Sequence, residues 1–150
     1  MKDYCFILDP TLGKLTQKIR FLGFKAIYYN NITYSELEAL ISKKVGCIVL
    51  TRKRKFYEKL KEKHRILFVK SDVWRSQLRY IIKTLNIKID QLKIGSLCLI
   101  CNSELKKVKK EDFKEIIPDY VYRTHDEFTY CEKCKKIYWK GTHVEHFMKD

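Results

Sequence analysis

The clearest indication of the fold class is the segment YCFILDPTLGKLTQKIRFLGFKAIYY, residues 4–29. It opens with a short continuous apolar run, residues 4–8, of the kind that is buried on both faces of a parallel sheet. Apolar residues then recur at helical spacing until Gly23, which is placed to end that helix. A second β-prone run follows at residues 25–29. The stretch therefore predicts a strand, a helix and a second strand, the unit from which parallel sheets are built.

The same alternation continues along the chain. Ser35 and Glu38 fit a capping box at the start of a second helix. The remaining predicted elements are a third strand at 47–50, a basic helix-permissive segment at 52–65, a fourth strand at 66–69 and an amphipathic helix at 74–85. We therefore predict an α/β fold, a sandwich with a parallel sheet, over residues 1–90.

The composition changes after residue 90. Residues 91–97 have the character of a linker, and residues 98–150 contain two Cys-x-x-Cys pairs and short β-prone pieces such as residues 128–130 and 137–139. One helical patch is expected near residues 111–116. We predict a small zinc ribbon as the second domain, from residue 98 to residue 150.

The cysteine pairs carry the strongest chemical signal. Zinc favours four thiolates in a tetrahedron, and a Cys-x-x-Cys turn directs two sulfurs toward one centre. Because four thiolates leave no position for a catalytic water, we expect a structural zinc site. The alternative is a set of reduced thiols or a redox pair. The four candidate ligands are Cys98, Cys101, Cys131 and Cys134.

Two further cysteines, Cys5 and Cys47, stand alone in apolar stretches. We interpret them as small buried hydrophobic residues. Disulfides would require an oxidising compartment, which no other feature of the sequence indicates.

The charge is unevenly distributed. The chain carries a net charge of +14, and residues 1–97 hold 21 Lys and Arg against 8 Asp and Glu, whereas residues 98–150 hold 11 against 10. A field of one sign captures polyanions and makes their binding sensitive to salt. We therefore expect a nucleic acid as partner, with a solvated lysine-rich surface as the alternative.

The hydrophobic fraction is 45%, which is enough apolar material for a globular fold. No apolar run approaches the roughly 18 to 20 residues that a bilayer requires, and the N-terminal segment contains the acidic Asp3. We expect a cytoplasmic protein with no membrane partner.

Acidic residues follow two of the predicted strands. Ligands of open α/β sheets bind beyond the carboxyl ends of the strands, where Asp9, Arg52 and the Ser71–Asp72 pair are expected. Carboxylates that converge there would hold Mg²⁺ or Mn²⁺, and Glu36 is a third candidate. The alternative for Asp9 and Asp72 is that each caps the helix that follows it.

Four strings in the chain have a familiar form: FILDPTLGKLTQKIRFLGF, VLTRKRKF, LFVKSD and the ribbon that ends in YWKGTH. Together they resemble the PIN-like ribonuclease domain of the Mut-seven C-terminal type over nearly the whole chain. In that family an aspartate ends the first strand, Thr-Arg-Asp follows the third, Ser-Asp follows the fourth, and a zinc ribbon closes the domain. The resemblance implies a PIN-like fold and metal-dependent endoribonuclease chemistry.

By this resemblance, Asp9 and Asp72 are catalytic carboxylates, and Glu36 falls near the acidic start of the family's second helix. The chain departs from the family at Lys53, which stands where aspartate is usual. An ammonium there competes with a divalent cation, unless its long side chain turns outward.

Several positive side chains are candidates to bind RNA phosphates: Arg52, Arg54 and Lys55. Tyr138 and Trp139 are candidates to stack on bases, with packing inside the ribbon as the alternative.

The sequence thus predicts an RNA-binding protein of a PIN-like, metal-dependent endoribonuclease family. The alternative is a degenerate RNA- or ribosome-binding module that has lost nuclease activity through Lys53. A DNA-binding zinc protein ranks below both, because no recognition helix is evident. The identity of the RNA and the oligomeric state stay open.

Overall fold

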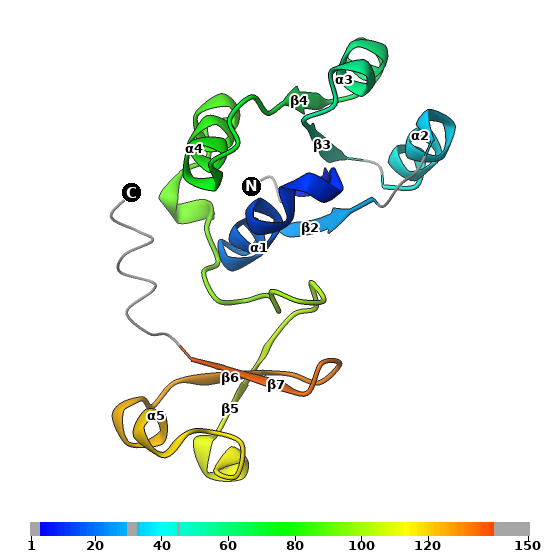
Figure 1. Cartoon of the computed structure of the whole chain (residues 1–150). Coiled ribbons are helices and arrows are strands. Elements are labelled where there is room, and N and C mark those ends of the chain that lie inside the picture. The colour runs from blue at the N-terminus through cyan, green and yellow to red at the C-terminus, as the bar shows by residue number, and fades with distance from the viewer. Residues whose placement is uncertain (1–3, 30–32, 45, 140–150) are drawn as a thin grey trace.

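The computed structural model describes residues 4–29, 33–44 and 46–139. These residues form a four-stranded sheet with helices and, beyond it, a three-stranded sheet (Figure 1). We name the part up to residue 92 the α/β lobe and residues 97–139 the ribbon lobe. No helix in the described part is long and apolar enough to cross a membrane.

The sheet of the α/β lobe is parallel and has the strand order β2-β1-β3-β4. Because the chain places β2 on one side of β1 and then crosses to the other side for β3, the order reverses between β1 and β3. Ligands of open α/β sheets bind at such a reversal. The strands are β1 (Cys5–Leu8), β2 (Lys25–Tyr28), β3 (Cys47–Thr51) and β4 (Ile66–Phe68).

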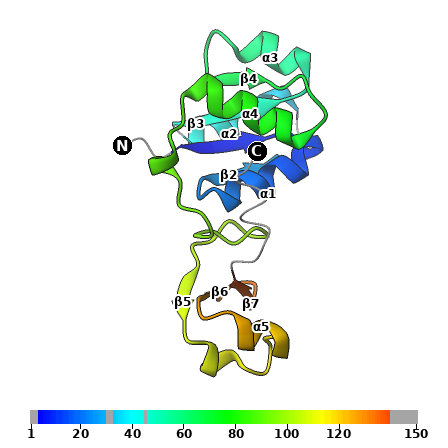
Figure 2. The same cartoon turned by 90° about the vertical axis from the view of Figure 1, so that its left-hand side faces the viewer.

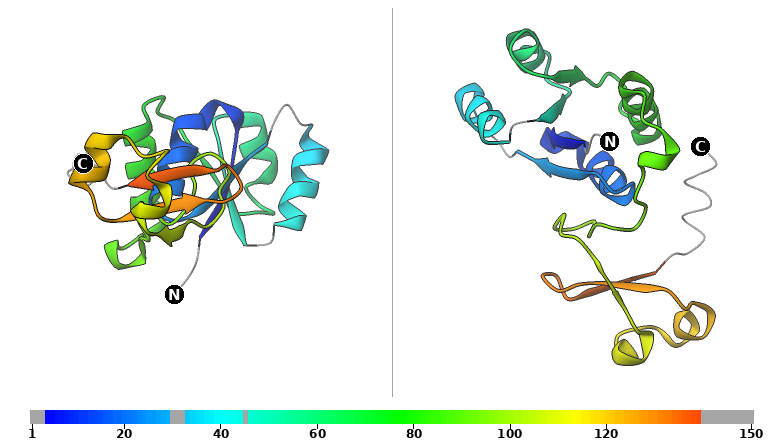
Figure 3. Two further views of the ribbon diagram at one scale, coloured as in Figure 1. Left: turned by 90° about the horizontal axis from the view of Figure 1, so that it is seen from below. Right: turned by 180° about the vertical axis from the view of Figure 1, so that it is seen from behind.

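Helices cover both faces of this sheet (Figures 1 and 3). On one face, α1 (Gly13–Phe21) and α4 (Trp74–Leu85) pack over Phe6, Leu8, Ile48 and Leu50. On the other, α2 (Tyr34–Lys43) and α3 (Arg54–Leu60) pack over Ile7 and Val49. The strands are therefore buried on both sides, which explains their continuous apolar runs. The predicted α/β fold with a parallel sheet is confirmed.

The linker returns to the end of α1 at Gly23. This glycine follows the C-cap residue Leu22 and has φ of +99°. A Cβ at this position would lie 2.5 Å from the carbonyl oxygen of Lys93, whose own N–H donates to the carbonyl of Leu22. Glycine is required here both by the backbone conformation and by the close approach of the linker.

Two local predictions are wrong. The capping box of α2 is formed by Thr33 and Glu36, not by Ser35 and Glu38. The physical reason is that Tyr34 and Ser35 already lie inside the first turn of the helix, so Thr33 is the residue with extended backbone that can accept from the N3 amide.

The interpretation of Cys5 and Cys47 as separate buried hydrophobic residues is also wrong. They are directly paired in the register of β1 and β3, their Cα atoms are 4.6 Å apart, and a disulfide joins them. Their separation of 42 residues hides this pairing in the sequence, because only the sheet register brings the two positions together.

The ribbon lobe is built on an antiparallel sheet of β5 (Lys106–Val108), β6 (Phe128–Cys131) and β7 (Lys136–Trp139) (Figure 2). A 3₁₀ helix, η3 (Lys110–Phe113), and α5 (Asp119–Thr124) close a small core around Ile117, Val121, Phe128 and Ile137. β6, β7 and the helical patch were expected, whereas β5 and α5 were not. Two short 3₁₀ helices, η1 (Pro10–Leu12) and η2 (Ile89–Gln91), complete the described elements.

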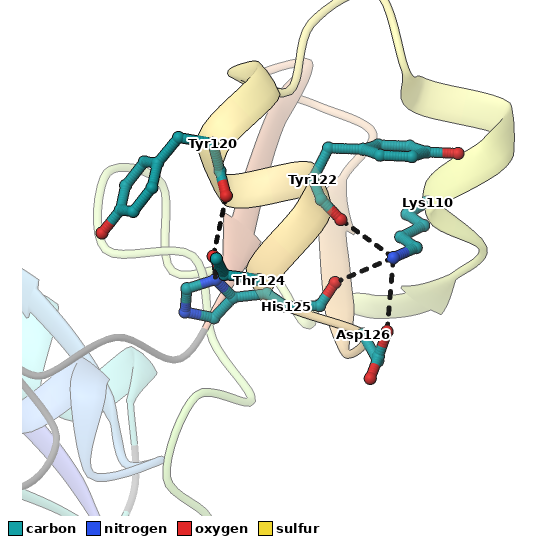
Figure 4. Close-up of polar contacts among 6 residues, drawn as sticks. All are labelled: Lys110, Tyr120, Tyr122, Thr124, His125 and Asp126. Atoms are coloured by element: carbon teal, nitrogen blue, oxygen red, sulfur yellow. Dashed lines mark hydrogen bonds and ion pairs between the residues drawn. The ribbon is translucent and has the colours of Figure 1, made fainter.

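A lysine holds the end of α5 in place (Figure 4). Lys110 Nζ donates to the carbonyl oxygens of Tyr122 and His125 at 2.8 and 3.2 Å and lies 3.3 Å from the carboxylate of Asp126. A cation at a helix C-terminus satisfies the last carbonyls and complements the helix dipole. The ammonium of Lys110 is therefore fully engaged inside the ribbon lobe.

The ribbon lobe is bonded to the α/β lobe through its first Cys-x-x-Cys turn, residues 98–102, which we name the first knuckle. Arg20, which is buried, donates to the carbonyl oxygens of Leu99 and Ile100 at 2.8 and 3.0 Å. The backbone N–H of Ala26, in the edge strand β2, donates to Asn102 Oδ1 at 3.0 Å. The first knuckle therefore covers part of an exposed sheet edge. The division at residues 90 and 98 into separately folding domains stays a prediction.

Candidate functional site

The first candidate site lies at the carboxyl ends of the parallel strands, where the strand order reverses between β1 and β3. Asp9 directly follows β1, and Arg52 directly follows β3. The backbone N–H of Asp9 donates to the carbonyl of Leu50, so the two strands stay paired up to this edge. Asp9 and Arg52, which the sequence predicts at this edge, are therefore neighbours.

Four donors surround the carboxylate of Asp9, which is fully buried. Oδ1 accepts from the backbone N–H of Thr11 at 2.7 Å and from the Thr11 hydroxyl. Oδ2 accepts from the backbone N–H of Arg52 at 2.8 Å and from the Thr51 hydroxyl at 3.4 Å. A carboxylate offers about four lone-pair positions. A metal ion would therefore have to displace one of these donors to bind Asp9.

The network continues into the core. The single proton of the Thr51 hydroxyl is directed at Asp9, so the hydroxyl of Tyr29, at 3.3 Å, donates to Thr51. Burial raises the pKa of Tyr29 to about 12, and the nearby charge of Asp9 acts in the same direction. Tyr29 thus stays a neutral donor to Thr51, whose own hydroxyl proton is directed at Asp9.

The loop after β4 is also held by hydrogen bonds. The guanidinium of Arg52 and the side-chain amide of Gln77 both donate to the carbonyl oxygen of Ser71. The Ser71 hydroxyl accepts from the backbone N–H of Val73 at the start of α4. These bonds fix the loop that carries Asp72.

The two other predicted carboxylates are exposed and do not join Asp9 in a cluster. Asp72 does not cap α4, whose N-cap residue is Val73. Glu36 accepts from the backbone N–H and the hydroxyl of Thr33 at 3.3 and 3.0 Å in the capping box of α2. Among the described residues, these three carboxylates do not form a group that could hold a metal ion.

Two positive side chains near this edge, those of Lys53 and Arg54, lie over aromatic rings. The ammonium of Lys53 lies 5.1 Å from the centre of the Phe56 ring, and the described residues include no ion pair between Lys53 and Asp9. The guanidinium of Arg54 stacks on Phe68 at 4.6 Å and lies 4.0 Å from Glu58. Lys55 is exposed on the first turn of α3.

The second candidate site is the group of four cysteines, whose sulfurs all lie within 4.8 Å of one another. Cys98 and Cys134 Sγ are 3.9 Å apart, and Cys101 and Cys131 Sγ are 3.5 Å apart. A tetrahedron with zinc–sulfur distances of about 2.3 Å has edges of about 3.8 Å. The four cysteines therefore have the spacing needed to hold a metal ion such as zinc.

The surroundings favour a charged thiolate at Cys101 and a neutral thiol at Cys134. The hydrogen bond with the Ser103 hydroxyl and the Ser103 backbone lower the pKa of Cys101 to about 6. The hydroxyl of Tyr138 lies 3.1 Å from Cys98 Sγ. In the absence of a cation the neighbouring cysteines and burial raise the pKa of Cys134 to about 12. A divalent cation would relieve this by neutralising the charge that the four sulfurs share.

The four cysteines were predicted as one group, and the structure brings them together. Ser103 and Tyr138, which contact the sulfurs, were not predicted. Neither residue type signals a contact to a thiolate from sequence spacing alone, because Tyr138 reaches Cys98 only through the fold of the ribbon lobe.

The chain matches one protein-family model, and the match spans both candidate sites. A protein-family model described as Mut7-C RNAse domain matches residues 4–150. No curated protein and no solved structure matches the chain. The matched range includes the carboxyl ends of the parallel strands and all four cysteines.

Proposed function

This chain belongs to the Mut7-C RNAse domain family, and on that premise we propose that it binds RNA at the carboxyl edge of its parallel sheet without cleaving it. We name as the carboxyl edge residues 9–14, 51–55 and 69–75, which follow β1, β3 and β4. The observation that carries the proposal is the carboxylate of Asp9, whose lone-pair positions are all used by protein donors.

Metal-dependent cleavage needs carboxylates that are free to bind Mg²⁺ or Mn²⁺. Asp9 is engaged, Glu36 is bonded to Thr33, and Lys53 replaces the remaining acidic position of the family pattern. Of the three predicted carboxylates, only Asp72 is both exposed and near this edge. One exposed carboxylate is a weak ligand set for a cation that prefers several oxygen ligands.

The charge of the carboxyl edge favours an anion. A surface rich in cations concentrates RNA and binds its phosphates. The edge carries seven positive side chains against two carboxylates: Lys14, Arg52, Lys53, Arg54, Lys55, Lys70 and Arg75 against Asp9 and Asp72. Arg52 is bonded to Ser71, so Lys53, Arg54 and Lys55 are the nearest exposed phosphate ligands beside it.

We further propose that the cysteine centre holds a structural zinc ion and that the protein acts in the cytoplasm, where the Cys5–Cys47 pair would be kept reduced, with the ribosome as one candidate RNA-containing partner. Four thiolates fill the coordination shell of zinc, so the ion would stabilise the ribbon lobe and take no part in chemistry.

A second candidate function is a metal-dependent endoribonuclease in which Asp9, Glu36 and Asp72 bind Mg²⁺ or Mn²⁺. Its support is the family to which the chain belongs, together with the exposed position of Asp72. For this function the donors around Asp9 would have to rearrange when metal and RNA bind.

The test compares RNA binding and RNA cleavage by the purified full-length chain. We expect salt-sensitive binding of a fluorescent single-stranded RNA and no Mn²⁺-dependent cleavage. Asp72→Asn, purified in parallel, controls for contaminating nuclease. Cleavage by the wild type that requires Mn²⁺ and disappears in Asp72→Asn would establish the second function, and absence of RNA binding would contradict the first.

A further inference from the structure

A cavity of about 900 Å³ lies between α1 and the sheet of the ribbon lobe. Gln17, Lys18 and Phe21 of α1 line one wall, and Lys107, Tyr138 and their neighbours line the opposite wall. Figures 1 and 2 show the ribbon sheet below α1. We name this cavity the interlobe groove.

One face of the ribbon sheet forms the lower wall. In the strand register Lys107 pairs with Thr129, and Thr129 pairs with Tyr138, so these three side chains share one face. Lys136 stands two residues before Tyr138 on the same face, and its ammonium is 5.7 Å from the Tyr138 ring. The wall thus combines an aromatic ring with two lysines.

The upper wall is also positive. The ammonium of Lys18 lies 4.7 Å from the ring centre of Trp74. Burial lowers the pKa of Lys18, and repulsion from Arg75 and Lys14 lowers it further. Lys14 and Lys18 are one helical turn apart, so they share a face of α1. This face connects the carboxyl edge, where Lys14 lies, with the interlobe groove.

The acidic residues of the groove do not cancel this charge. Asp126 and Glu127 line it, but the carboxylate of Asp126 is bonded to Lys110 (Figure 4). The ammonium groups of Lys107 and Lys136, in contrast, form no hydrogen bond or ion pair within the described ranges. Their charges are available to an anionic ligand.

We propose that the interlobe groove binds a single-stranded segment of the RNA, a proposal that rests on the proposed RNA-binding function. Lysines that contact phosphates beside aromatic rings that stack on bases are the combination that binds single strands. A volume of about 900 Å³ suits a ligand of small-molecule size, so the groove admits a few unpaired nucleotides and excludes a duplex. The RNA runs from the carboxyl edge along Lys14 and Lys18 into the groove.

The first test maps contacts on the unmodified protein. A single-stranded oligonucleotide that contains 4-thiouridine is bound to the full chain and crosslinked by light, and the attached peptides are identified by mass spectrometry. We expect crosslinks to the peptide that contains Tyr138 and Trp139 as well as to residues 51–75. Crosslinks confined to residues 51–75 would contradict RNA binding in the interlobe groove and leave the proposed function intact.

The second test is charge reversal in the groove. The double variant Lys107→Glu, Lys136→Glu should weaken binding of single-stranded RNA by roughly tenfold or more and reduce the salt slope by about 0.7 for each phosphate that the variant no longer neutralises. Lys109→Glu with Lys114→Glu is the matched control, because it makes the same charge change and both lysines are exposed outside the groove. All four lysines are exposed, so thermal melting should show folded proteins.

The outcomes separate the two proposals. If the groove variant and the control bind RNA with equal affinity, the proposed role of the interlobe groove is wrong, while the proposed RNA-binding function stands. A wild-type protein that binds no RNA would overturn the proposed function and, with it, the groove. A double-stranded RNA of the same length that competes as well as the single strand would also overturn the groove.

Discussion

Arg20 Nη1 donates a hydrogen bond to the carbonyl oxygen of Leu99 over 2.8 Å, and this bond attaches α1 to the first knuckle. The same guanidinium donates to Ile100 and, through Nε, to Ala26. Two of the four cysteines therefore lie in a segment that is bonded to the α/β lobe. The buried side chain of Arg20 therefore joins the cysteine centre to the α/β lobe, together with the bond from Ala26 to Asn102.

Truncating this side chain should destabilise the protein. Arg20→Ala leaves three carbonyl oxygens without their donor, and hydrogen bonds to charged groups contribute about 1.5–3 kcal/mol each. Allowing for partial replacement by water, we expect the free energy of unfolding in urea to fall by about 2–4 kcal/mol. Arg79→Ala, at an exposed position of α4, is the control and should change it by less than about 0.5 kcal/mol. Equal effects would contradict the coupling.

Removing zinc should loosen one edge of the parallel sheet. Asn102 holds the amide of Ala26 only while the first knuckle keeps its shape, which has φ of +70° at Asn102. After chelation, or in Cys131→Ser, we expect the ribbon lobe to unfold and the Ala26 amide to exchange hydrogen faster.

The amide of Val49, which donates to Arg65 in the centre of the sheet, is the internal control and should stay protected. Loss of protection at Val49 would show instead that both lobes share one cooperative core. Elemental analysis of protein purified without chelator should find one zinc per chain.

Asp9→Asn should lower the stability of the folded protein, whether or not Asp9 takes part in a reaction. The amide group of asparagine would direct two N–H donors at positions that now face donors from Thr11, Thr51 or Arg52. We expect a loss of about 2–4 kcal/mol in the free energy of unfolding. Asp72→Asn changes an exposed carboxylate and should stay within about 0.5 kcal/mol. An Asp9→Asn variant as stable as the wild type would show that the network around Asp9 contributes little.

RNA affinity should depend on the carboxyl edge. Arg54→Glu with Lys55→Glu should weaken RNA binding and flatten its dependence on salt, because the variant neutralises fewer phosphates and therefore releases fewer counterions. Lys43→Glu with Lys44→Glu, at the far end of α2, makes the same charge change away from this edge. An unchanged salt slope in the first variant would place the RNA footprint elsewhere.

The bond between Cys5 and Cys47 should stabilise the oxidised protein. It closes a loop with a separation of 42 residues, for which chain entropy predicts about 4 kcal/mol. Cys5→Ala with Cys47→Ala should therefore unfold at a lower urea concentration than the oxidised wild type. The two proteins should differ much less under reducing conditions, and a difference that survives reduction would come from packing at these positions.

Local patterns in the sequence were sufficient to predict most of the α/β lobe. The strands are continuous apolar runs because helices cover both faces, and α4 spans the predicted residues 74–85. The four cysteines were predicted because the paired spacing is itself the chemical signal. β5 was missed, because Lys106 and Lys107 have no strand pattern without their partners on β6.

The fold class, the cysteine centre and the excess of positive charge follow from the amino-acid sequence alone, since each depends on residue type and local spacing. The folded chain was needed to show that Asp9 is enclosed by donors, that Lys53 lies over Phe56 and that Cys5 pairs with Cys47. It was also needed to show that Arg20 bonds to the first knuckle. These relationships join residues up to 80 positions apart, and their geometry follows from strand order and register, which residue type and local spacing do not specify.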